Sequence, residues 1–422
     1  MLDIRLIREK SDFVKQRLAA RGENVSTVDD ALEIDVQRRK IITEVEQLKS
    51  ERNSISKEIG IRKKNKESAD DLMQGMKQKS ERIAQFDEEV RQLEEKQQGI
   101  LLCIPNLPHE ACPVGKDEKD NPEVHTFGKK PELNFEPKSH MELVADLGMI
   151  DFSAAATLSG SGFLVFKAAG ARLERALISY LLDKHADKNG YTEISPPFIV
   201  RGACMQGTGQ LPKFREDAYC IESEELFLTP TAEVPVTNLH RESILSAEDL
   251  PKKYVAYTPC FRKEAGSAGK ETRGMTRVHQ FDKVELVKIV DQDSSFNELE
   301  SLLRHAEEIL EELGLHYRTI ELCTGDLGFG AAKCYDVEVW APGAQSYLEV
   351  SSCSNFLDFQ SRRMNLRYKD KDGKNKFCHT LNGSGTALPR LFIALIETYQ
   401  QKDGRIKLPE PLHDYFGAKE IS

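Results

Sequence analysis

Two short segments on either side of a glycine-rich stretch carry the residues best suited to chemistry. The first ends in Phe-Arg-Lys-Glu at 261–264, and the second begins at Arg277 and contains Phe281 and Glu285. If the segments are neighbouring strands, Arg262 and Arg277 lie over one face of a sheet. Guanidinium groups match phosphate oxygens, so such a pair predicts a grip on a triphosphate. An arginine–glutamate pair on a hairpin is also a common surface ion pair, and these residues alone leave both interpretations open.

The elements that must position these residues belong to the part of the chain after about residue 110. Short β-branched and aromatic segments predict strands there, and amphipathic segments predict helices. The strands are expected at 254–262, 279–290, 335–342 and 346–356, and the helices at 168–187 and 296–314. Strands this close in sequence favour an α+β fold with an antiparallel β-sheet flanked by helices over βαβ units. Neither G-x-G-x-x-G after a strand nor G-x-x-x-x-G-K-[ST] occurs, so another kind of site must bind any nucleotide.

Residues 28 to about 102 have a different pattern, which predicts two long helices. Apolar residues recur at alternating spacings of three and four, from Ile41 to Ile59 and from Leu72 to Ile100. This is the 3.5-residue period of a coiled-coil seam, which is interrupted only at the polar positions Arg52, Lys79 and Gln97. Matching seams with a turn near 60–69 predict a long antiparallel two-helix coiled-coil arm of roughly 50 Å, with about 32 residues per helix.

The ends of this arm have their own signals. Thr27-x-x-Asp30 and Ser68-x-x-Asp71 resemble capping boxes and predict the two helix starts. Pro105 predicts the stop, because proline cannot continue the hydrogen-bond ladder of a helix.

A cluster of cations lies at the predicted turn of the arm, and it consists of Arg62, Lys63, Lys64 and Lys66. From residue 38 to residue 67 there are ten Lys or Arg and five Asp or Glu. This composition fits a solvated coiled-coil surface, and it also fits a basic finger that touches a phosphate backbone. Since the net charge of the chain is −10, a polyanionic partner would have to meet a local basic patch of this kind.

Length and composition predict the domain organisation and the cellular compartment. The 422 residues, 39% of them hydrophobic, predict an arm at 1–105 and a second domain at 106–422, with a Pro/Gly/charge-rich connector at 106–137. The sequence contains no run of eighteen apolar residues, so no membrane span is expected. The charged N-terminus lacks the apolar centre of a signal peptide. Nine cysteines without a C-x-x-C pair favour reduced thiols, a cytoplasmic location and no structural zinc.

Five segments together resemble the class II aminoacyl-tRNA synthetases, in the form typical of seryl-tRNA synthetases. FRKEAG through RVHQFDKVE resembles their motif 2, and TLNGSGTALPRLFIALIE resembles motif 3. Gly190-Tyr191-x-x-Ile194-x-x-Pro197 resembles motif 1, which builds the dimer in that family. FLTPTAE at 227–233 is similar to the serine-pocket strand, and EVSSCSN at 349–355 is similar to the strand that binds ATP and metal. The resemblance covers the whole chain and implies the class II synthetase fold.

The resemblance implies a role for each matching residue at the nucleotide. Arg262 would hold the α-phosphate, Arg277 the outer phosphates and Arg390 the γ-phosphate, so Arg262 and Arg390 are the expected catalytic residues. The full expected ATP set is Arg262, Lys263, Glu264, Arg277, Val278, Phe281, Glu349, Val350, Ser351, Ser352 and Arg390. Phe281 would stack on adenine, although on its own it could be a core aromatic. Glu349 and Ser352 would hold Mg²⁺, a cation that prefers oxygen ligands.

One departure from the family pattern is Pro389, where many members have glycine. Proline suits a first helical turn, so Arg390 is expected in its normal place.

The resemblance likewise implies a serine pocket made of Thr231, Ala232, Glu233, Arg262, Glu285 and Ser384. Thr231 and Glu233 would face the ammonium, and Glu285 and Ser384 the hydroxyl. A buried pocket that hydrogen-bonds a hydroxyl rejects alanine, because its own polar groups are then left unpaired. A zinc-dependent pocket is not expected, because no cysteine lies in step with these segments.

The function that this resemblance implies is a serine–tRNA ligase. Serine would be activated by ATP to seryl-adenylate and then transferred to the 3′ end of tRNA(Ser), with tRNA(Sec) as a further candidate substrate. A cytoplasmic homodimer with the arm on tRNA is expected. Two alternatives are an amino-acid:carrier-protein ligase of the same fold, and a catalytically silent coiled-coil or RNA-binding paralogue.

Overall fold

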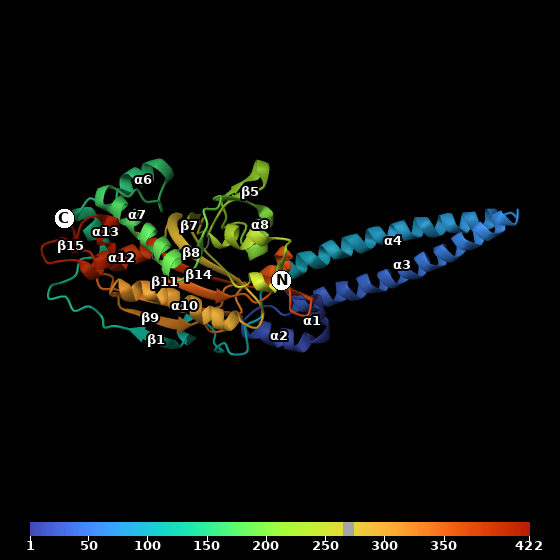
Figure 1. The fold of residues 1–422 in the computed structure, drawn as a ribbon, viewed down its shortest axis with the longest axis horizontal. Coiled ribbons are helices and arrows are strands. Elements are labelled where there is room, and N and C mark those ends of the chain that lie inside the picture. Colours follow the sequence, from blue (N-terminus) through green and yellow to red (C-terminus); the bar gives the residue numbers. More distant parts are fainter. Residues whose placement is uncertain (265–273) are drawn as a thin grey trace. The chain divides into compact units, whose positions relative to one another are not determined.

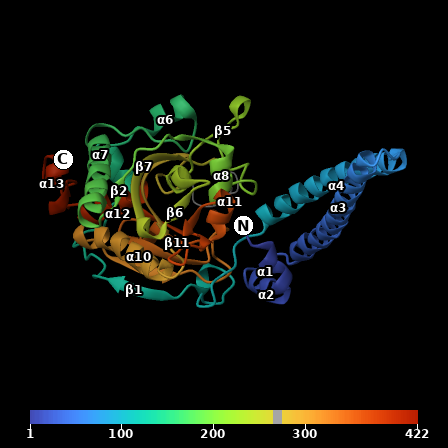
Figure 2. The ribbon, with the colours of Figure 1, turned by 45° about the vertical axis from the view of Figure 1, so that its right-hand side comes forward.

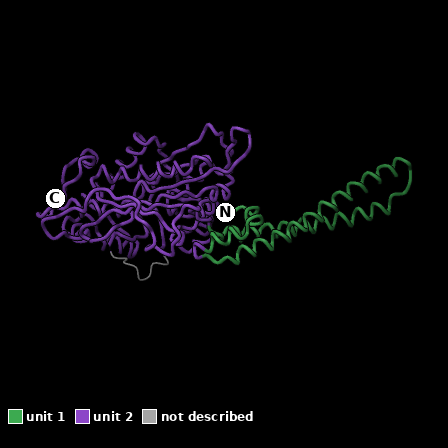
Figure 3. The backbone as a smooth tube through the Cα atoms, turned by 90° about the horizontal axis from the view of Figure 1, so that it is seen from below, with its two compact units in different colours: residues 1–19, 23–105 green, residues 20–22, 106–422 purple. Residues whose placement is uncertain are grey.

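The computed structural model describes residues 1–264 and 274–422, which form two compact units (Figure 3). Unit 1 contains residues 1–19 and 23–105, and unit 2 contains residues 20–22 and 106–422. The glycine-rich stretch expected between the two strands of motif 2 falls mainly on 265–273 and so lies outside the described residues. Among the described residues, no helix combines the length and the apolar character needed to cross a bilayer.

Unit 1 consists of two short helices, α1 (Ile4–Glu9) and α2 (Ser11–Ala20), and two long ones, α3 (Ser26–Lys64) and α4 (Asp70–Cys103). The long helices run side by side as a hairpin with a short turn between them (Figure 1). The predicted seam is confirmed, because Val45 and Ile59 of α3 and Ile83, Phe86 and Leu93 of α4 are buried. The coiled-coil arm expected from the 3.5-residue period is therefore present.

Polar positions within the seam are also paired. Lys79 of α4 forms an ion pair with Glu51 of α3, so its ammonium is not left alone in the interface. Gln97 is buried, and its side chain helps to lower the pKa of Asp35 in the opposite helix. A polar residue at one seam position fixes which residues of the two helices face each other.

The predicted capping boxes at the starts of these helices are wrong. Thr27 lies inside α3, and its hydroxyl donates to the Asn24 carbonyl at 3.1 Å, whereas the Ser26 N–H is bound by the Asn24 side chain at 3.0 Å. Ser68 lies one residue before the cap of α4, and its hydroxyl accepts from the Asp70 N–H at 3.4 Å. In both cases a hydroxyl shifted by one or two positions forms a local turn rather than a cap. The predicted stop is right, since α4 ends at Cys103.

Unit 2 is built on an eight-stranded sheet in the order β1-β9-β10-β11-β14-β8-β7-β2. Its strands are β1 (Glu123–Phe127), β2 (Thr192–Glu193), β7 (Lys252–Phe261), β8 (Gln280–Val290), β9 (Tyr317–Glu321), β10 (Lys333–Ala341), β11 (Ser346–Asn355) and β14 (His379–Ala387). All neighbours are antiparallel except β2 and β7. This confirms the expected α+β fold and all four predicted strands. The edge strand β1 was not predicted, because its residues are mostly polar and exposed and lie in the connector.

Three helices cover one face of this sheet, here called the back face (Figure 2). They are α7 (Ala168–Asp183), α10 (Ser295–Glu312) and α12 (Leu388–Tyr399), and their apolar sides join Val284, Leu286, Val337 and Val339 of the strands in one core. Side chains alternate along a strand, so residues such as 281, 283 and 285 of β8 point to the other face, here called the front face.

Smaller elements complete unit 2. They are α5 (His140–Asp146), α6 (Phe152–Ser159), α8 (Gly202–Thr208), α9 (Glu233–Thr237), α11 (Phe359–Met364), α13 (His413–Phe416), β3 (Ile199–Arg201), β4 (Cys220–Ile221), β5 (Leu226–Leu228), β6 (Ile244–Ser246), β12 (Arg367–Lys369), β13 (Asn375–Phe377), β15 (Ile406–Lys407) and β16 (Glu420–Ile421).

A buried acid joins the elements of unit 1. The side chain of Asp35 in α3 is only 1% exposed, and its carboxylate accepts two hydrogen bonds from Arg8 of α1, at 2.8 and 3.2 Å. Burial alone would raise the pKa of Asp35, but the hydrogen bonds and charge of Arg8 outweigh it and hold the pKa below its usual value. A carboxyl whose pKa is lowered by folding stabilises the fold above its unfolded pKa and loses that contribution as the pH falls.

We expect Asp35→Asn to lower the unfolding free energy of the full chain by about 2 kcal/mol, because it removes a charged acceptor from a buried pair. Circular dichroism of the helices in denaturant measures this loss, and the difference from wild type should shrink below about pH 4. The control is Asp29→Asn, which breaks an ion pair with Lys15 that is largely solvent-exposed and should cost less than about 0.5 kcal/mol. Equal losses for the two variants would contradict the role given to Asp35.

Candidate functional site

A cavity of about 440 Å³ opens on the front face of the sheet. The strands β8, β11 and β14 form its floor, the first turn of α12 forms one wall, and segments near 208–214 and 328–331 form another. Of the residues predicted from the sequence, those lining the cavity are Thr231, Glu233, Arg262, Glu264, Arg277, Val278, Phe281, Glu349, Val350, Ser352, Ser384 and Arg390. These side chains come from a stretch of 160 residues, 231–390, and the fold brings them to one cavity.

The arginines that line the cavity are held by neighbouring groups. Arg262 donates from Nε to the Pro230 carbonyl at 3.3 Å, and its guanidinium lies 5.1 Å from the centre of the Phe281 ring. Arg277 donates from Nη1 to Glu264 at 2.6 Å. A planar cation held in place before a ligand arrives loses little conformational freedom on binding.

Arg390 reaches the same cavity from the start of α12. It donates from Nη1 to the Glu349 carbonyl at 2.8 Å and from Nε to the Thr276 carbonyl at 3.3 Å. Pro389 occupies the first turn of α12, where proline leaves no hydrogen bond unmade, so the residue that departs from the family pattern does not displace the arginine. Three guanidinium groups therefore face one cavity, which makes it suited to a ligand with several phosphate groups.

Oxygen donors lie on the β11 wall beside Arg390. The Glu349 side chain is exposed to the cavity, with Oε2 at 3.4 Å from Arg390 Nη1, and Ser352 lies three residues further along the strand. A carboxylate, a hydroxyl and the phosphates of a ligand are the donor set that Mg²⁺ takes in nucleotide sites, so these residues fit that cation. Within residues 1–264 and 274–422, no group of three or more His, Cys, Asp or Glu side chains could hold a metal by itself.

The other end of the cavity is a small polar pocket around two buried acids. Glu233, at the start of α9, accepts a hydrogen bond from Gln360 at 2.6 Å. Burial and the nearby charge of Glu285 raise the pKa of Glu233 to about 7, although Gln360 opposes that rise. A carboxyl with this pKa can be either protonated and neutral or ionised near neutral pH, and its anion suits a bound cation.

Glu285 is the second acid, and it lies just below the cavity surface. Its carboxylate forms an ion pair with Lys283 and accepts from Asn382 at 2.9 Å and from the Ser384 hydroxyl at 3.5 Å. Ser384 lies opposite Glu285 in the register of β14 and β8, which explains why the two meet. These groups form a site for a small hydroxyl, which can both donate and accept hydrogen bonds.

Four predicted residues do not line the cavity. Ala232 is fully buried, and Glu285 is reached through Ser384. Ser351 points to the back face and donates its hydroxyl to the Ser384 carbonyl at 2.6 Å. The Lys263 ammonium lies 5.7 Å from the centre of the Tyr219 ring.

The expectation that Thr231-Ala232-Glu233 lies on a strand is wrong. The strand β5 ends at Leu228, and Glu233 begins the short helix α9. Pro230 follows the strand, and the Thr231 hydroxyl accepts from the Glu233 N–H at 3.2 Å, which turns the chain into the helix.

Sequence reasoning missed Lys283, Asn382 and Gln360. The period of a strand could have found the first two, because Lys283 shares a face with Glu285 and Asn382 shares one with Ser384. Gln360 comes from α11, more than a hundred residues from Glu233, and no local pattern marks it.

Comparisons with known proteins place the chain in a family. Residues 1–108 match the family described as the seryl-tRNA synthetase N-terminal domain, and residues 217–399 match the tRNA synthetase class II core domain (G, H, P, S and T). A serine–tRNA ligase of Akkermansia muciniphila is 59% identical over 99% of this chain and 98% of its own length, and one of Geobacillus kaustophilus is 52% identical over the full length of both. A crystal structure of seryl-tRNA synthetase from Pyrococcus horikoshii complexed with ATP superimposes with a TM-score of 0.94 at 41% identity, over 100% of this chain and 99% of that one.

Proposed function

The chain belongs to the seryl-tRNA synthetases, and we propose that its front-face cavity is where serine is activated with ATP before it is attached to tRNA. The observation that carries this assignment is the convergence of Arg262 and Arg390 on one cavity that also contains a small pocket with two buried acids. The first feature suits a nucleoside triphosphate and the second suits an amino acid with a hydroxyl. The two features share Arg262, so the reacting groups would meet beside it.

At the nucleotide end, Arg262 binds the α-phosphate together with the serine carboxylate, and Arg277 and Arg390 bind the outer phosphates. The Phe281 ring stacks on adenine, and Val278 contacts the nucleotide through its backbone. Glu264 supports this proposal because it already pairs with Arg277 at 2.6 Å and can position that cation. The carboxylate of serine is ionised at neutral pH, so its attack on the α-phosphate needs positioning and charge stabilisation rather than a general base.

Glu349 and Ser352 would hold Mg²⁺ at the phosphates, and the cation would supply positive charge for the departing pyrophosphate. Cys334 Sγ lies 3.2 Å from Ser352 Oγ and 3.6 Å from Asp336 Oδ1, so Ser352 has support from the neighbouring strand.

At the serine end, Thr231 and Glu233 face the ammonium, and Glu285 and Ser384 face the hydroxyl. The contacts of Glu285 with Lys283, Asn382 and Ser384 support a hydrogen-bonding role, because they fix its carboxyl beside the Ser384 hydroxyl. Alanine would leave these buried groups without a partner, and a larger side chain would not fit beside them.

The second step requires the 3′ end of tRNA to reach the adenylate. A further cavity of about 420 Å³ adjoins the first and shares Thr231, Arg262, Glu264 and Arg277 with it. It supports an approach of the terminal ribose past Arg262. The four cations at the turn of the arm, Arg62, Lys63, Lys64 and Lys66, are assigned to the tRNA backbone, and the three lysines among them are exposed.

Several finer expectations belong to the same proposal. We assign tRNA(Ser) as the substrate, with tRNA(Sec) as a further candidate, and a cytoplasmic homodimer built through motif 1 as the active form. The domain assignment, with a tRNA-binding arm at 1–105 and a catalytic part at 106–422, also stays a prediction, as does the absence of zinc. The carrier-protein ligase is disfavoured because the full arm is present, and the silent paralogue is disfavoured because Arg262, Glu233, Glu285 and Arg390 are all present.

Amino-acid-dependent exchange of pyrophosphate into ATP tests the assignment. We expect exchange with serine only, and its loss by at least about a thousandfold in Arg262→Ala, because that residue contacts both reacting groups. Arg215→Ala, at a surface arginine outside the lining of the main cavity, is the control and should retain exchange. Near-normal exchange by Arg262→Ala would refute the role of that residue, and serine exchange without charging of tRNA would favour the carrier-protein ligase.

The ionisation of Glu233 should make serine binding depend on pH. Since the pKa of this carboxyl is about 7 in the free enzyme and its anion faces the ammonium, the KM for serine should fall as the pH rises from 5.5 to 7.5. Below the pKa the change should approach about tenfold per pH unit. Glu233→Gln should raise the KM and flatten its pH profile, while the KM for ATP stays the same. A profile that is unchanged in Glu233→Gln would contradict the assignment.

The turn of the arm offers a matched pair of variants. Lys63, Lys64 and Lys66 are exposed, and none pairs with an acid among the described residues, whereas Arg62 forms ion pairs with Glu58 and Asp71. Replacing the three lysines by alanine should raise the KM for tRNA about tenfold at physiological salt and weaken its salt dependence, with serine activation unchanged.

Arg62→Ala is the control for this triple variant, and it should have a smaller effect because its charge is already paired. Unchanged charging kinetics in the triple variant would remove the basis for assigning the lysines to tRNA.

A further inference from the structure

A buried histidine lies on the back face of the sheet, directly behind the serine pocket. His185 belongs to a π-helical turn, Lys184–Lys188, that follows α7. Its side chain has no solvent exposure, and the Asn189 side chain and the Gly385 backbone are the hydrogen-bonding groups that act on its ring. π-Turns inside helices occur often at functional sites.

The imidazole packs against Gly385 of β14. A Cβ atom at Gly385 would lie 3.0 Å from Nε2 and 3.2 Å from Cδ2 of His185, and 3.3 Å from Cγ1 of Val284. A side chain at 385 would therefore crowd the ring, which would have to shift to make room for it. The ring and this backbone are in direct contact across the back face.

Gly385 is the residue at which β14 bulges. The register with β8 shifts between Ser384, which pairs with Glu285, and Thr386, which pairs with Val284. A bulge re-aims the side chain beside it. The Ser384 carbonyl is also fixed from the neighbouring strand, since it accepts from the Ser351 hydroxyl at 2.6 Å. The place of the Ser384 hydroxyl thus depends on how this bulge is held.

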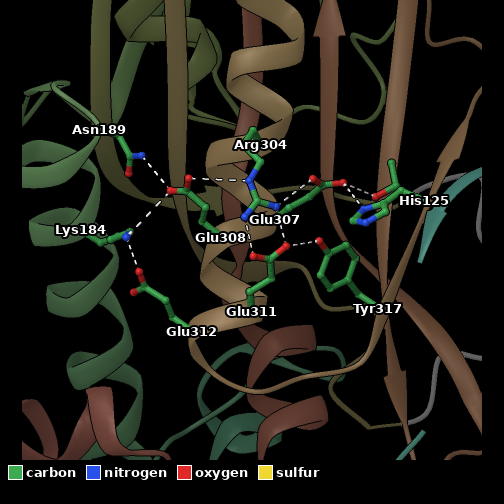
Figure 4. A network of polar contacts seen from close by, with 10 residues as sticks. His125, Lys184, Asn189, Arg304, Glu307, Glu308, Glu311, Glu312 and Tyr317 are labelled. Carbon is green, nitrogen blue, oxygen red and sulfur yellow. Dashed lines mark hydrogen bonds and ion pairs between the residues drawn. The ribbon is translucent and has the colours of Figure 1, made fainter. Parts of the chain in front are cut away.

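Lys184 in the π-turn and Asn189 just after it are both anchored on α10 (Figure 4). Lys184 forms an ion pair with Glu312 of α10, and Asn189 donates from Nδ2 to Glu308 of the same helix at 3.0 Å. In Figure 4 both side chains point to α10, where Arg304 joins Glu308 to Glu311. The imidazole is therefore mounted on a fixed support rather than on a mobile loop.

We propose that His185 is a positioning residue for amino-acid selection, because its ring holds the bulge at Gly385 that places Ser384 opposite Glu285. This inference rests on the proposed roles of Ser384 and Glu285 in binding the serine hydroxyl. Burial lowers the pKa of His185 to about 3, so the ring is neutral at working pH and acts by its shape. The inference concerns serine alone, since the nucleotide end of the cavity is built from other residues.

Kinetics of pyrophosphate exchange test the proposal. His185→Ala should raise the KM for serine about ten- to a hundredfold and reduce the preference for serine over alanine, with the KM for ATP within about twofold of wild type. His185→Leu keeps most of the ring volume and should recover most of the preference. The control is His305→Ala, which loses a part-buried hydrogen bond with Tyr191 in the same region and is not among the residues whose atoms lie nearest to a Cβ at Gly385. A purely structural role predicts that His185→Ala and His305→Ala lose thermal stability alike and keep the preference, which would overturn the proposal.

A double-mutant cycle keeps the test decisive if His185→Ala folds poorly. Gly385→Ala should damage serine selection because its methyl group meets the ring, and adding His185→Ala should restore part of the selection by making room. Additive losses would overturn the proposal.

Ser384→Ala and Glu285→Gln distinguish failure of the proposed serine pocket from failure of the inference about His185. If they leave serine recognition unchanged, the proposed pocket is wrong, and if they impair it while the His185 variants do not, only the present inference fails.

Discussion

Two acids, Glu233 and Glu285, lie buried close together next to the cavity, and the rest of the site depends on how their charges are accommodated. Burial and the charge of Glu285 raise the pKa of Glu233. Glu285 forms an ion pair with Lys283 and accepts a hydrogen bond from Asn382, and Glu233 accepts one from Gln360. The acid beside the cation stays an acceptor, whereas Glu233 keeps a pKa near neutral and so can respond to a bound cation. A pocket of this kind binds an ammonium and a hydroxyl together, and it places both next to Arg262.

The regular alternation of side chains along the strands places these groups on the front face of the sheet. Alternation along β8 sends Phe281, Lys283 and Glu285 to the front face and Val284 and Leu286 into the core under α7, α10 and α12. A sheet that is rigid on its back face holds the front-face groups in place before substrates bind, which is what catalysis by positioning requires. The bulge at Gly385 is a place where the pocket departs from regular strand geometry, and there a buried ring supports it from behind.

Much of the fold could be predicted because its signals are local. The seam from Ile41 to Ile100 follows from its spacing and the four strands follow from their β-branched and aromatic residues, while the resemblance of the motifs indicated the arginines that the structure brings to one cavity. The capping boxes failed because a hydroxyl one or two positions away serves a local turn equally well. Gln360 could not be predicted, because only the tertiary structure brings α11 to Glu233.

The central claim is that phosphate-binding arginines and a pocket for a hydroxymethyl group meet at one point of one cavity. A crystal structure of the enzyme with a non-hydrolysable analogue of seryl-adenylate tests it most directly. The account predicts that the phosphate mimic contacts Arg262, the adenine lies on Phe281 and the serine hydroxyl lies between Glu285 and Ser384. An analogue bound with its hydroxyl directed away from these two residues, or outside the cavity, would contradict it.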